Sequence, residues 1–532
     1  MLDNFADLWE LVSDTVGERI AIVHGDAERN WADFDARASR LAAALAELGV
    51  GYKTTVAINL RNCIENLETL YAAFKLRAVP FNVNYRYRER ELTYLLNDAK
   101  PAVIIYDHGL ADRVLPSIEL SGLAVRAIEV NHAAEPSEGA LSFEELIASH
   151  DPAPRIERDG DDDYIVYTGG TTGYPKGVVW AQGISLMPQL FNGGHLSSPV
   201  EFVRFVEETD SKSARLVIAP LMHASGFLGA TNALATGGPV VFCASTSLNP
   251  EEILTLIERY RVRNFGVIGD AIARPILEAL ERAEAEGRPY DLSSVETVSN
   301  TGGIWSAPVK KGFLKYGNFK ISDGLSATEG PGFAIAEATS PDEIETAKFR
   351  LGPTARVINE QGKDVVPGSG EVGILATTGR LPKGYLNDPV KTAQAWPTID
   401  GVRYSMPGDL ATIEVDGTVT LLGRGSEMVN TGGEKVFVEE VETAILSHSA
   451  VRDTLVVGLP DERWGNRVAA VVALRAGSTA TEREIIDHVG RELADYKRPR
   501  QVVFVSEIPR SPTGKADRPA AKRLAEGVEA GA

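Results

Sequence analysis

The chain is poor in cysteine and has no long apolar run. Its 532 residues include two cysteines, Cys63 and Cys243, which form no Cys-x-x-Cys pair. Disulfide frameworks and cysteine-rich zinc sites are therefore unsupported, and the composition is typical of a reducing cytoplasm. No stretch of about 18 apolar residues occurs, so no transmembrane helix is predicted. Residues 1–18 lack the basic start and apolar block of a signal peptide.

Positive charge is also scarce. The 54 lysines and arginines face 74 acidic residues, and the formal net charge is −20. Such a chain repels nucleic acid and anionic membrane surfaces on average, so neither is expected as a partner. Local basic pockets can still bind phosphates.

What the sequence does contain is enough apolar material for a large core, since 44% of its residues are hydrophobic. Apolar residues at helical spacing in 31–50 predict an amphipathic helix, and the short apolar runs 56–60 and 102–106 predict buried strands. Strands that alternate with helices indicate parallel sheets with helices packed against them. Near the end of the chain, 501–505 is a further predicted strand.

We therefore predict an α/β fold with two parts. A chain of 532 residues exceeds the roughly 250–300 residues at which single cores stop growing, so several subdomains are expected. The larger part, residues 1–425, is an N-terminal body of mixed and parallel sheets flanked by helices. Short β-like runs between turn residues in 352–419 add a small antiparallel, β-barrel-like subdomain to it. The smaller part, residues 426–532, is an α+β C-terminal lid domain.

The acidic segment 151–163 is predicted to be an exposed loop, and a short predicted strand follows it at 164–168. A turn of glycines and hydroxyl residues comes directly after that strand. The run reads Tyr167-Thr168-Gly169-Gly170-Thr171-Thr172-Gly173-Tyr174-Pro175-Lys176-Gly177. Glycines let backbone N–H groups approach an anion, the threonines add O–H donors, and Lys176 adds a positive charge. No Gly-Lys-Ser/Thr occurs at the Walker spacing. The run predicts a phosphate cradle, against the alternative of an ordinary flexible loop.

This run resembles the phosphate-binding signature of the adenylate-forming superfamily. That superfamily includes acyl-CoA synthetases, luciferases and the adenylation domains of peptide synthetases. The resemblance covers essentially the whole chain, because further motifs similar to those of the family follow in the expected order. It implies that ATP binds at Thr168, Gly169, Gly170, Thr171, Thr172 and Lys176.

The segment 322–330 resembles the family's aromatic-Gly-x-Thr-Glu motif. The resemblance implies that Thr328 contacts the α-phosphate and that Glu329 holds Mg²⁺, a hard cation that takes carboxylate oxygens. Leu325 stands where the family usually has an aromatic residue stacked on adenine, and Ser326 stands where it has glycine. The ATP contacts implied by this segment are Asp323, Leu325, Ser326 and Thr328. Taken alone, Glu329 would be interpreted as a solvated surface acid.

Two motifs further along resemble the ribose and hinge segments of the family. The Gly408-Asp409 turn resembles the motif whose aspartate accepts hydrogen bonds from both ribose hydroxyls. In 422–436 the resemblance implies that Arg424 contacts the ribose and that Ser426 is the hinge, since small residues absorb large backbone rotations. The alternative is a plain interdomain linker. The implied CoA contacts are Gly432, Gly433 and Lys435.

The segment 508–515 resembles the family's C-terminal Pro-x-x-x-x-Gly-Lys loop, in which the lysine is catalytic. Lys515 is then expected to stabilise the negative charge that gathers when a carboxylate attacks the α-phosphate. A fixed ammonium stabilises that transition state more than the ground state. Taken alone, such a lysine is usually a solvated charge. The four preceding motifs favour the catalytic interpretation.

The acyl pocket is predicted from the segment 220–227, which resembles the part of the family that lies beside the substrate carboxylate. His223 either orients the acyl group or is a buried structural histidine. The run 228–235 is small and apolar, which favours room for a bulky acyl group. Gly302 and Gly303 follow a predicted strand and would border the acyl pocket and the adenine. The predicted pocket residues are His223, Phe227 and Gly302.

The resemblance implies an ATP-dependent acyl-CoA synthetase. Carboxylate and ATP would give acyl-AMP and pyrophosphate, and CoA would then give acyl-CoA and AMP. The expected cofactors are ATP, Mg²⁺ and coenzyme A. Details of the motifs are similar to fatty or steroid side-chain acyl-CoA synthetases, which implies a medium-chain, long-chain or polycyclic (steroid or terpenoid) carboxylic acid. The expected location is cytoplasmic, and a homodimer is an open alternative.

Other functions are weighed against this one. Amino-acid-activating domains usually carry an aspartate at the start of the pocket helix, and 227–231 has no acid. A stand-alone adenylation enzyme that loads a carrier protein remains an alternative, as does a non-catalytic relative that binds nucleotide and acid. A hydrolase is disfavoured, because the sequence has no Gly-x-Ser-x-Gly and no His-Glu-x-x-His.

Overall fold

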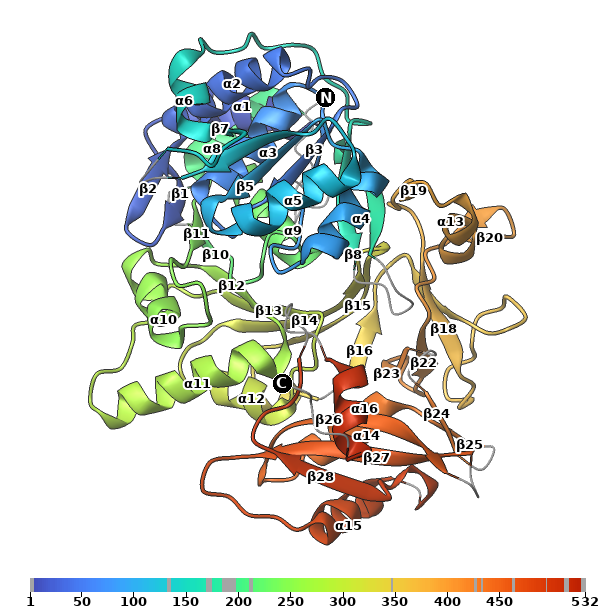
Figure 1. The fold of residues 1–532 in the computed structure, drawn as a ribbon. Coiled ribbons are helices and arrows are strands. Elements are labelled where there is room, and N and C mark those ends of the chain that lie inside the picture. Colours follow the sequence, from blue (N-terminus) through green and yellow to red (C-terminus); the bar gives the residue numbers. More distant parts are fainter. Residues whose placement is uncertain are drawn as a thin grey trace. The chain divides into compact units, whose positions relative to one another are not determined.

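The fold is built from two units, each made of three separate stretches of the chain. The first unit comprises Met1–Gly266, Arg282–Val298 and Arg380–Trp396, and the second comprises Val267–Glu281, Ser299–Gly379 and Pro397–Ala532. The structure is a computed structural model that describes residues 4–131, 135–168, 175–183, 198–209, 214–345, 348–424, 428–431, 434–461, 465–493, 495–510 and 516–527. Figure 1 follows the chain from blue to red.

The first unit contains an eight-stranded sheet whose middle is parallel, as predicted. Its strands are β3 (Thr55–Asn59), β4 (Val79–Asn82), β5 (Val103–Asp107), β6 (Arg126–Val130), β7 (Ala140–Ser142), β8 (Asp163–Thr168), β9 (Lys176–Ala181) and β19 (Gly384–Tyr385). They pair in the order β19-β9-β8-β4-β3-β5-β6-β7, with only β9 and β19 antiparallel to their neighbours. The middle strands are almost wholly buried, as expected of a parallel sheet covered on both faces.

The helices of the first unit include the predicted amphipathic helix. They are α1 (Phe5–Val16), α2 (Trp31–Glu47), α3 (Ile64–Lys75), α4 (Glu89–Ala99), η1 (His108–Leu110), α5 (Ala111–Ser121), α6 (Phe143–Ser149), α8 (Pro199–Glu208), α9 (Ala224–Ala235), α10 (Pro250–Arg259) and α13 (Pro389–Ala395). Helix α2 begins after Asn30, whose side chain caps the helix by accepting a bond from the Asp33 N–H, and it buries Phe34 and Leu41. No helix in the described part of the chain is long and apolar enough to cross a bilayer.

A second set of strands in the first unit is β1 (Ile20–His24), β2 (Ala27–Asn30), β10 (Arg215–Leu216), β11 (Val240–Phe242) and β12 (Asn264–Val267), in the order β12-β10-β11-β1-β2. The main core of the unit is aromatic. Trp9 contacts the rings of Phe5, Phe34, Tyr71 and Phe74 at centroid distances of 5.2–6.1 Å, and all five side chains are fully buried. Such rings contribute large apolar burial and hold α1 and α3 together.

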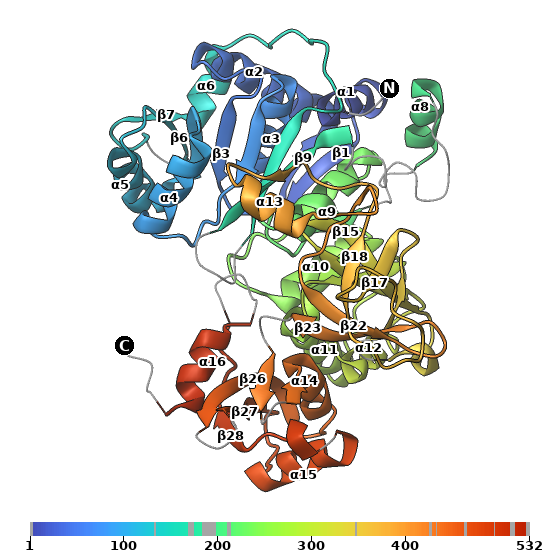
Figure 2. The ribbon, with the colours of Figure 1, turned by 90° about the vertical axis from the view of Figure 1, so that its right-hand side faces the viewer.

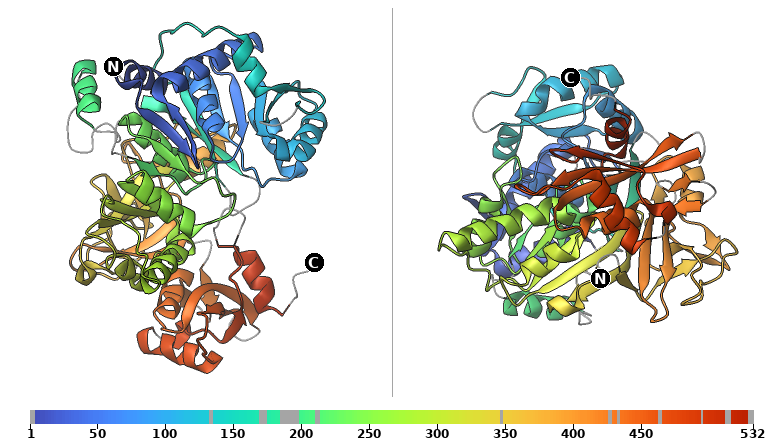
Figure 3. Two further views of the ribbon diagram at one scale, coloured as in Figure 1. Left: turned by 90° about the vertical axis from the view of Figure 1, so that its left-hand side faces the viewer. Right: turned by 90° about the horizontal axis from the view of Figure 1, so that it is seen from below.

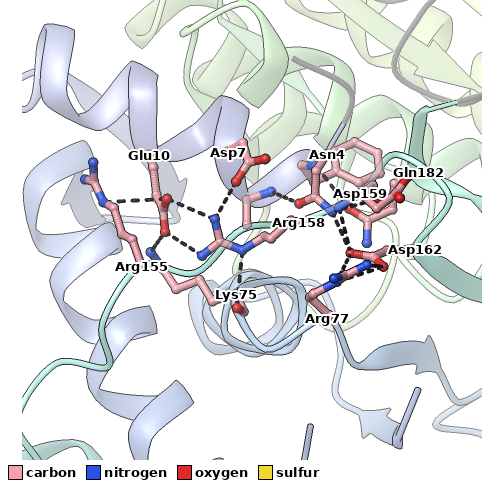
Figure 4. A network of polar contacts seen from close by, with 12 residues as sticks. Asn4, Asp7, Glu10, Lys75, Arg77, Arg155, Arg158, Asp159, Asp162 and Gln182 are labelled. Carbon is pink, nitrogen blue, oxygen red and sulfur yellow. Dashed lines mark hydrogen bonds and ion pairs between the residues drawn. The ribbon is translucent and has the colours of Figure 1, made fainter. Parts of the chain in front are cut away.

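The acidic segment at 151–163 is mostly exposed, as predicted, but two of its side chains are buried anchors (Figure 4). The Arg158 side chain is 1% exposed and donates to Glu10 at 2.9 Å, with a second ion pair to Asp7. The Asp162 side chain is 2% exposed and accepts a bidentate bond from Arg77, the shortest contact being 2.8 Å. Sequence reading missed these anchors because their partners lie some 85 to 150 residues away.

The same network fastens the open end of the β8–β9 hairpin. The backbone N–H of Gln182, just after β9, donates to the carbonyl of Asp162, just before β8, at 2.9 Å. The Gln182 side chain accepts a bond from the Phe5 N–H at 3.0 Å, and Asn4 donates to the Asp162 carboxylate at 3.2 Å (Figure 4). The hairpin that carries the predicted phosphate loop is therefore tied to the start of α1.

The second unit is dominated by antiparallel strands. Its elements are α11 (Gly269–Ala285), β13 (Thr297–Thr301), α12 (Ala307–Phe313), β14 (Lys320–Ala327), β15 (Gly330–Ala338), η2 (Pro341–Glu343), β16 (Lys348–Leu351), β17 (Ala355–Ile358), β18 (Gly373–Thr377), β20 (Thr398–Ile399), β21 (Val402–Arg403), β22 (Asp409–Ile413) and β23 (Val419–Arg424). The order β17-β18-β22-β23-β16-β15-β14 is antiparallel throughout. The small β subdomain predicted at 352–419 is present, and Phe333, Val357, Leu375 and Val419 form its core.

The C-terminal part of the second unit is the predicted α+β domain (Figure 3). Its elements are β24 (Val429–Thr431), β25 (Glu434–Val436), α14 (Val438–Leu446), β26 (Val451–Asp461), β27 (Gly465–Leu474), α15 (Glu482–Glu492), η4 (Asp495–Lys497), β28 (Gln501–Val505) and α16 (Arg518–Ala525). Alternate residues of β26 and β27 fill two cores, one shared with α14 and α15 and the other with α16. The boundary at 425/426 falls on residues outside the described ones and stays a prediction.

Two histidines of this domain predict a pH effect on stability. The rings of His448 and His488 meet at 5.0 Å, and burial, with the charge of His488, lowers the pKa of His448. The unfolded chain then binds a proton more readily, so this part of the stability is present above about pH 6.5 and is lost as the pH falls through that value. We expect His448→Gln to reduce the fall in melting temperature between about pH 8 and about pH 5.5. The same scan of His150→Gln is the control, and parallel curves for wild type and His448→Gln would contradict the prediction.

Candidate active site

The predicted phosphate loop begins and ends on two paired strands. Thr168 is the last residue of β8 and Lys176 is the first of β9, and the hairpin register places them opposite each other. Side chains opposite each other on one face have Cβ atoms about 4.5–5.5 Å apart, so the hydroxyl and the ammonium start from neighbouring positions. The other predicted members of the loop, Gly169, Gly170, Thr171 and Thr172, lie outside the described residues.

Lys176 is held by the segment that returns to the first unit at 380–396. Its Nζ lies 5.0 Å from the centroid of the Tyr385 ring, a cation–π contact. A backbone hydrogen bond from Lys391 lowers the pKa of Asp388, and the nearby charge of Lys176 lowers it further. The ammonium is therefore held against an aromatic face at the end of the loop. Neither Tyr385 nor Asp388 was singled out from the sequence, because both lie more than 200 residues away.

The two predicted acyl-pocket residues of the first unit lie at the start of α9. His223 is the N-cap residue, and its backbone N–H donates to the Pro220 carbonyl at 3.0 Å. Phe227 is 3% exposed, and its ring stacks on Tyr164 with centroids 4.7 Å apart. This packing favours a core role for Phe227. The acyl-pocket roles of His223 and Phe227 stay predictions.

Most small residues of α9 are buried by close packing. Ala230, Ala233 and Ala235 are 0–3% exposed and belong to the main core of the unit. A Cβ added to Gly226 would lie 2.2 Å from the Pro220 carbonyl oxygen, so the helix approaches that backbone too closely for any larger residue. Three of the small residues in the run 228–235 are therefore core residues, and the room for a bulky acyl group beside this run stays a prediction.

In the second unit a polar framework fixes the Thr301-Gly302-Gly303 turn. Asn300 is 2% exposed and uses its whole amide, accepting from the Gly269 N–H at 2.6 Å and donating to the Gly303 carbonyl at 2.9 Å and to Asp323 at 2.6 Å. The other oxygen of Asp323 pairs with Lys310 at 2.5 Å. The Asp323 carboxylate is therefore engaged by protein groups, and its predicted contact with ATP stays a prediction.

The N-terminus of α11 closes this framework from the other side. The Asp270 carboxylate accepts bonds from the Ser306 N–H at 2.8 Å and the Ser306 hydroxyl at 2.7 Å, and it pairs with Arg274. Burial raises the pKa of Asp270, although these partners oppose the shift. The Asp270 N–H donates to the Ile304 carbonyl at 2.9 Å, and Gly269 has a positive φ of 57° where an added Cβ would meet that carbonyl. Only glycine allows this approach.

Thr328 and Glu329 form the turn between β14 and β15. The pairing of these strands shifts register between Leu325 and Ala327, which makes an irregularity at Ser326 of the kind that often re-aims side chains near active sites. Leu325, the residue in the adenine-stacking position, is half-buried against the core of the β subdomain. The Ser405 hydroxyl, which is fully buried, donates to the Glu329 carbonyl at 2.8 Å. The structure thus brings the Thr328–Glu329 turn next to the segment that leads to Asp409.

The two predicted ribose contacts are cross-strand neighbours. Asp409 begins β22 and Arg424 ends β23, and the register pairs these two residues with each other. An acidic and a basic residue at these paired backbone positions are residue types that suit the two hydroxyls of a ribose. Two separate motifs indicated these residues, and the pairing of β22 with β23 shows that their backbones lie side by side. The Arg424 side chain is not among the described ones.

The residues present fit a magnesium site that is completed by a nucleotide. Among the described residues, no group of three or more His, Cys, Asp or Glu side chains gathers as in a dedicated metal site. Mg²⁺ in nucleotide-dependent enzymes is held by one or two carboxylates together with phosphate oxygens and water. Glu329 places a single carboxylate at the β14–β15 turn, which is the number and kind of donor that such a site takes, and its role as the magnesium ligand stays a prediction.

The predicted site residues fall into two described groups, and several lie outside them. The first unit holds Thr168, Lys176, His223 and Phe227. The second unit holds Gly302, Gly303, Asp323, Leu325, Ser326, Thr328, Glu329, Asp409 and Arg424. Ser426, Gly432, Gly433 and Lys515 lie outside the described residues, and only the backbone of Lys435, in β25, is described.

Sequence reasoning missed the groups that support these residues. Asn300, Asp270 and Ser405 contact the turns that carry Gly303, Ile304 and Glu329, yet none was predicted. A signal for Asn300 was available, because an amide directly before the Thr301-Gly302-Gly303 turn needs hydrogen-bond partners when it is buried. Ser405 follows a buried tyrosine and gave no comparable signal.

Comparison with known proteins agrees with the motif order. The family described as AMP-binding enzyme matches residues 9–386, and the AMP-binding enzyme C-terminal domain matches residues 440–515. The 3-oxocholest-4-en-26-oate–CoA ligase of Rhodococcus rhodochrous is 39% identical over 97% of this chain and 94% of its own. The medium-chain acyl-CoA ligase Mig of Mycobacterium avium is 37% identical over 95% of each chain. The medium/long-chain-fatty-acid–CoA/3-oxocholest-4-en-26-oate–CoA ligase of Mycolicibacterium smegmatis is 36% identical over 98% of this chain and 96% of its own.

Solved structures confirm the predicted fold class. The crystal structure of the anthranilate CoA ligase AuaEII in complex with anthranoyl-AMP has a TM-score of 0.84 at 22% identity and covers 98% of this chain and 97% of its own. A benzoate CoA ligase from Burkholderia xenovorans LB400 has a TM-score of 0.82 at 22% identity and covers 98% of this chain and all of its own. The family resemblance inferred from the motifs is confirmed as well.

Proposed function

Because the chain belongs to the AMP-binding enzyme family, we propose that it is an ATP-dependent acyl-CoA synthetase for medium-chain, long-chain or steroid side-chain carboxylic acids. The observation that carries this proposal is identity of 36–39% along nearly the full length to three CoA ligases named for such acids. The β22–β23 pairing of Asp409 with Arg424 supports a nucleotide site in the same chain.

The first half-reaction joins the acid to AMP. A carboxylate oxygen of the acid attacks the α-phosphorus of ATP, the bond to the bridging oxygen breaks, and pyrophosphate leaves. Thr168 and Lys176 bind the phosphates with Gly169, Gly170, Thr171 and Thr172, while Thr328 contacts the α-phosphate. Asp409 and Arg424 hold the ribose, and the Gly302-Gly303 turn borders the adenine and the acyl group. Lys515 stabilises the charge at the reacting centre.

Glu329 would hold the magnesium ion that accompanies the triphosphate. When bound there, Mg²⁺ would supply positive charge that offsets part of the phosphate charge. The Ser405 hydroxyl fixes the Glu329 backbone at 2.8 Å, so the turn is placed before the nucleotide arrives. Such preorganisation avoids a cost at the moment of reaction.

The second half-reaction transfers the acyl group to CoA. The CoA thiol gives its proton to solvent, its sulfur attacks the acyl carbon, the bond between that carbon and the phosphate oxygen breaks, and AMP leaves. The lid, residues 426–532, rotates about Ser426 between the two steps, and Gly432, Gly433 and Lys435 line the path of the thiol. Domain movement of this kind commits the substrate and completes the site in many enzymes. CoA rather than a carrier protein is the proposed acceptor, and the enzyme is proposed to be cytoplasmic. The homodimer stays a prediction.

A substrate panel tests the proposal. Pyrophosphate release and CoA-dependent AMP formation are measured with acetate, octanoate, palmitate, benzoate and 3-oxocholest-4-en-26-oate. Each buried methylene contributes about 0.8 kcal/mol, so we expect kcat/KM for the best long or polycyclic acid to exceed that for acetate by at least roughly 100-fold. A preference for acetate or benzoate would overturn the substrate class. Pyrophosphate release with no CoA-dependent AMP formation would favour the carrier-loading alternative.

A further inference from the structure

Strand β8, the incoming strand that leads into the predicted phosphate loop, is joined to helix α4 by one hydrogen bond. Tyr167, next to Thr168 in β8, is 7% exposed, and its hydroxyl donates to the Asp98 carboxylate at 2.7 Å. Burial raises the pKa of Tyr167, and the charge of Asp98 raises it further, so the phenol stays protonated and donates. A hydrogen bond to a charged acceptor is stronger than a neutral one.

The outgoing strand is fastened to the same helix and to β19. Tyr94, one helical turn before Asp98 and therefore on the same face of α4, donates to the Pro175 carbonyl at 3.4 Å. On the other side of the strand, the Leu386 N–H donates to the Gly177 carbonyl at 2.7 Å. Both residues that flank Lys176 are thus held through their backbone carbonyls.

A further contact joins these bonds into a ring around the neck of the loop, the paired residues Thr168 and Lys176 where the loop begins and ends. The Asn387 side chain donates to the Asp98 carbonyl at 2.9 Å and so joins the returning segment to α4. Asn387 has a positive φ of 55°, a conformation that costs free energy in a residue with a side chain and persists where surrounding contacts fix it. A Cβ on Gly177 would lie 3.1 Å from the Tyr167 ring, so the two strands meet closely inside this ring of contacts. Figure 2 shows α13 in orange, on the returning segment whose strand β19 pairs with β9.

We propose that Asp98 is a positioning residue for ATP binding, acting through Tyr167 and Asn387 to hold Thr168 and Lys176 in place at the neck of the phosphate loop. Asp98 is linked to both sides of the neck, since its carboxylate binds the incoming strand and its carbonyl binds the segment paired with the outgoing one. The inference rests on the proposed function, because it takes Thr168 and Lys176 as phosphate contacts. Helix α4, which carries none of the sequence motifs, would thereby contribute to nucleotide binding.

Kinetics of four variants test the inference. Asp98→Ala and Tyr167→Phe each remove the bond, and we expect each to raise the KM for ATP about tenfold while kcat and the KM for the acid change less than about twofold. The double variant should show little further loss, since both changes break one contact. Asp98→Asn keeps an acceptor oxygen and should return the KM for ATP to within about threefold of wild type. Asn97→Ala, whose amide bonds within α4, is the matched control and should behave as wild type.

Each outcome decides one question. A lower melting temperature for Asp98→Ala with an unchanged KM for ATP would show a purely structural role and overturn the inference. If Asp98→Ala does not fold, Tyr167→Phe, which loses a single oxygen, decides by the same readout. Lys176→Ala distinguishes failure of the phosphate site from failure of the positioning role of Asp98. An unchanged KM for ATP in that variant would refute the phosphate site itself, whereas a raised KM there with a normal KM in Tyr167→Phe would refute only the role of Asp98.

Discussion

Replacing Lys515 with alanine is expected to abolish pyrophosphate release and to spare thioester formation from supplied acyl-AMP. In the proposed mechanism the lysine acts only in the first step, where the carboxylate and the α-phosphate are both anionic and must come together. A fixed positive charge at that point stabilises the transition state, and removing one such group typically costs on the order of 10²–10³ in rate. The family match of the C-terminal domain extends to residue 515, which supports this assignment.

The measurement uses two assays on one preparation. Pyrophosphate release with ATP and octanoate reports adenylation, and thioester formation from synthetic octanoyl-AMP and CoA reports the second step. Lys522→Ala, which removes an equal charge from α16 of the same domain, is the control and should leave both rates near those of wild type. An equal loss of rate in both assays for Lys515→Ala would contradict the proposal that this lysine acts in adenylation alone.

Replacing Lys310 with methionine is expected to lower the free energy of unfolding by about 3–5 kcal/mol, because it leaves the Asp323 carboxylate buried without its cation. Asp323 is 5% exposed and Lys310 is 2% exposed, so water replaces the lost partner poorly. The Asp323 carboxylate also accepts a hydrogen bond from the Asn300 amide, which donates a second bond to the Gly303 carbonyl. The loss should therefore reach the Gly302-Gly303 turn and raise the KM for ATP as well.

Urea denaturation and ATP kinetics on the same variant measure the two effects. Lys311→Met, at the neighbouring exposed position, is the matched control and should leave the stability within about 0.5 kcal/mol of wild type. The double variant Lys310→Met with Asp323→Leu removes both charges and should recover part of the loss, since a buried pair can often be replaced by apolar groups. A Lys310→Met protein as stable as Lys311→Met would show that the pair contributes nothing.

Local patterns predicted the elements of the fold well. The apolar spacing in 31–50 predicted α2, and the run 501–505 predicted β28 with its observed bounds. Alternation of strands with helices predicted the parallel middle of the eight-stranded sheet. These predictions succeed because periodicity and turn residues act over a few neighbouring positions, and the same residues decide the element.

Long-range pairing could not be predicted in the same way. Tyr167 and Asp98 are 69 residues apart, and Asn300 and Asp323 are 23 apart, so no motif contains either pair. The motif for Asp409 and that for Arg424 each indicated the ribose, but only the register of β22 with β23 places the two opposite each other. The stacking of Phe227 on Tyr164, 63 residues earlier in the chain, is likewise absent from any motif, and the acyl-pocket role of Phe227 stays a prediction.

The path of the chain between its two units limits how the protein can be divided. With less than half of the second unit formed, the chain returns at Arg380–Trp396, where β19 pairs with β9 and the Leu386 N–H donates to the carbonyl of Gly177. A fragment that stops before Arg380 would leave β9 as a bare outer strand, a common starting point for aggregation. Truncation at a single point therefore cannot produce the first unit alone. Its three stretches would have to be joined by new linkers.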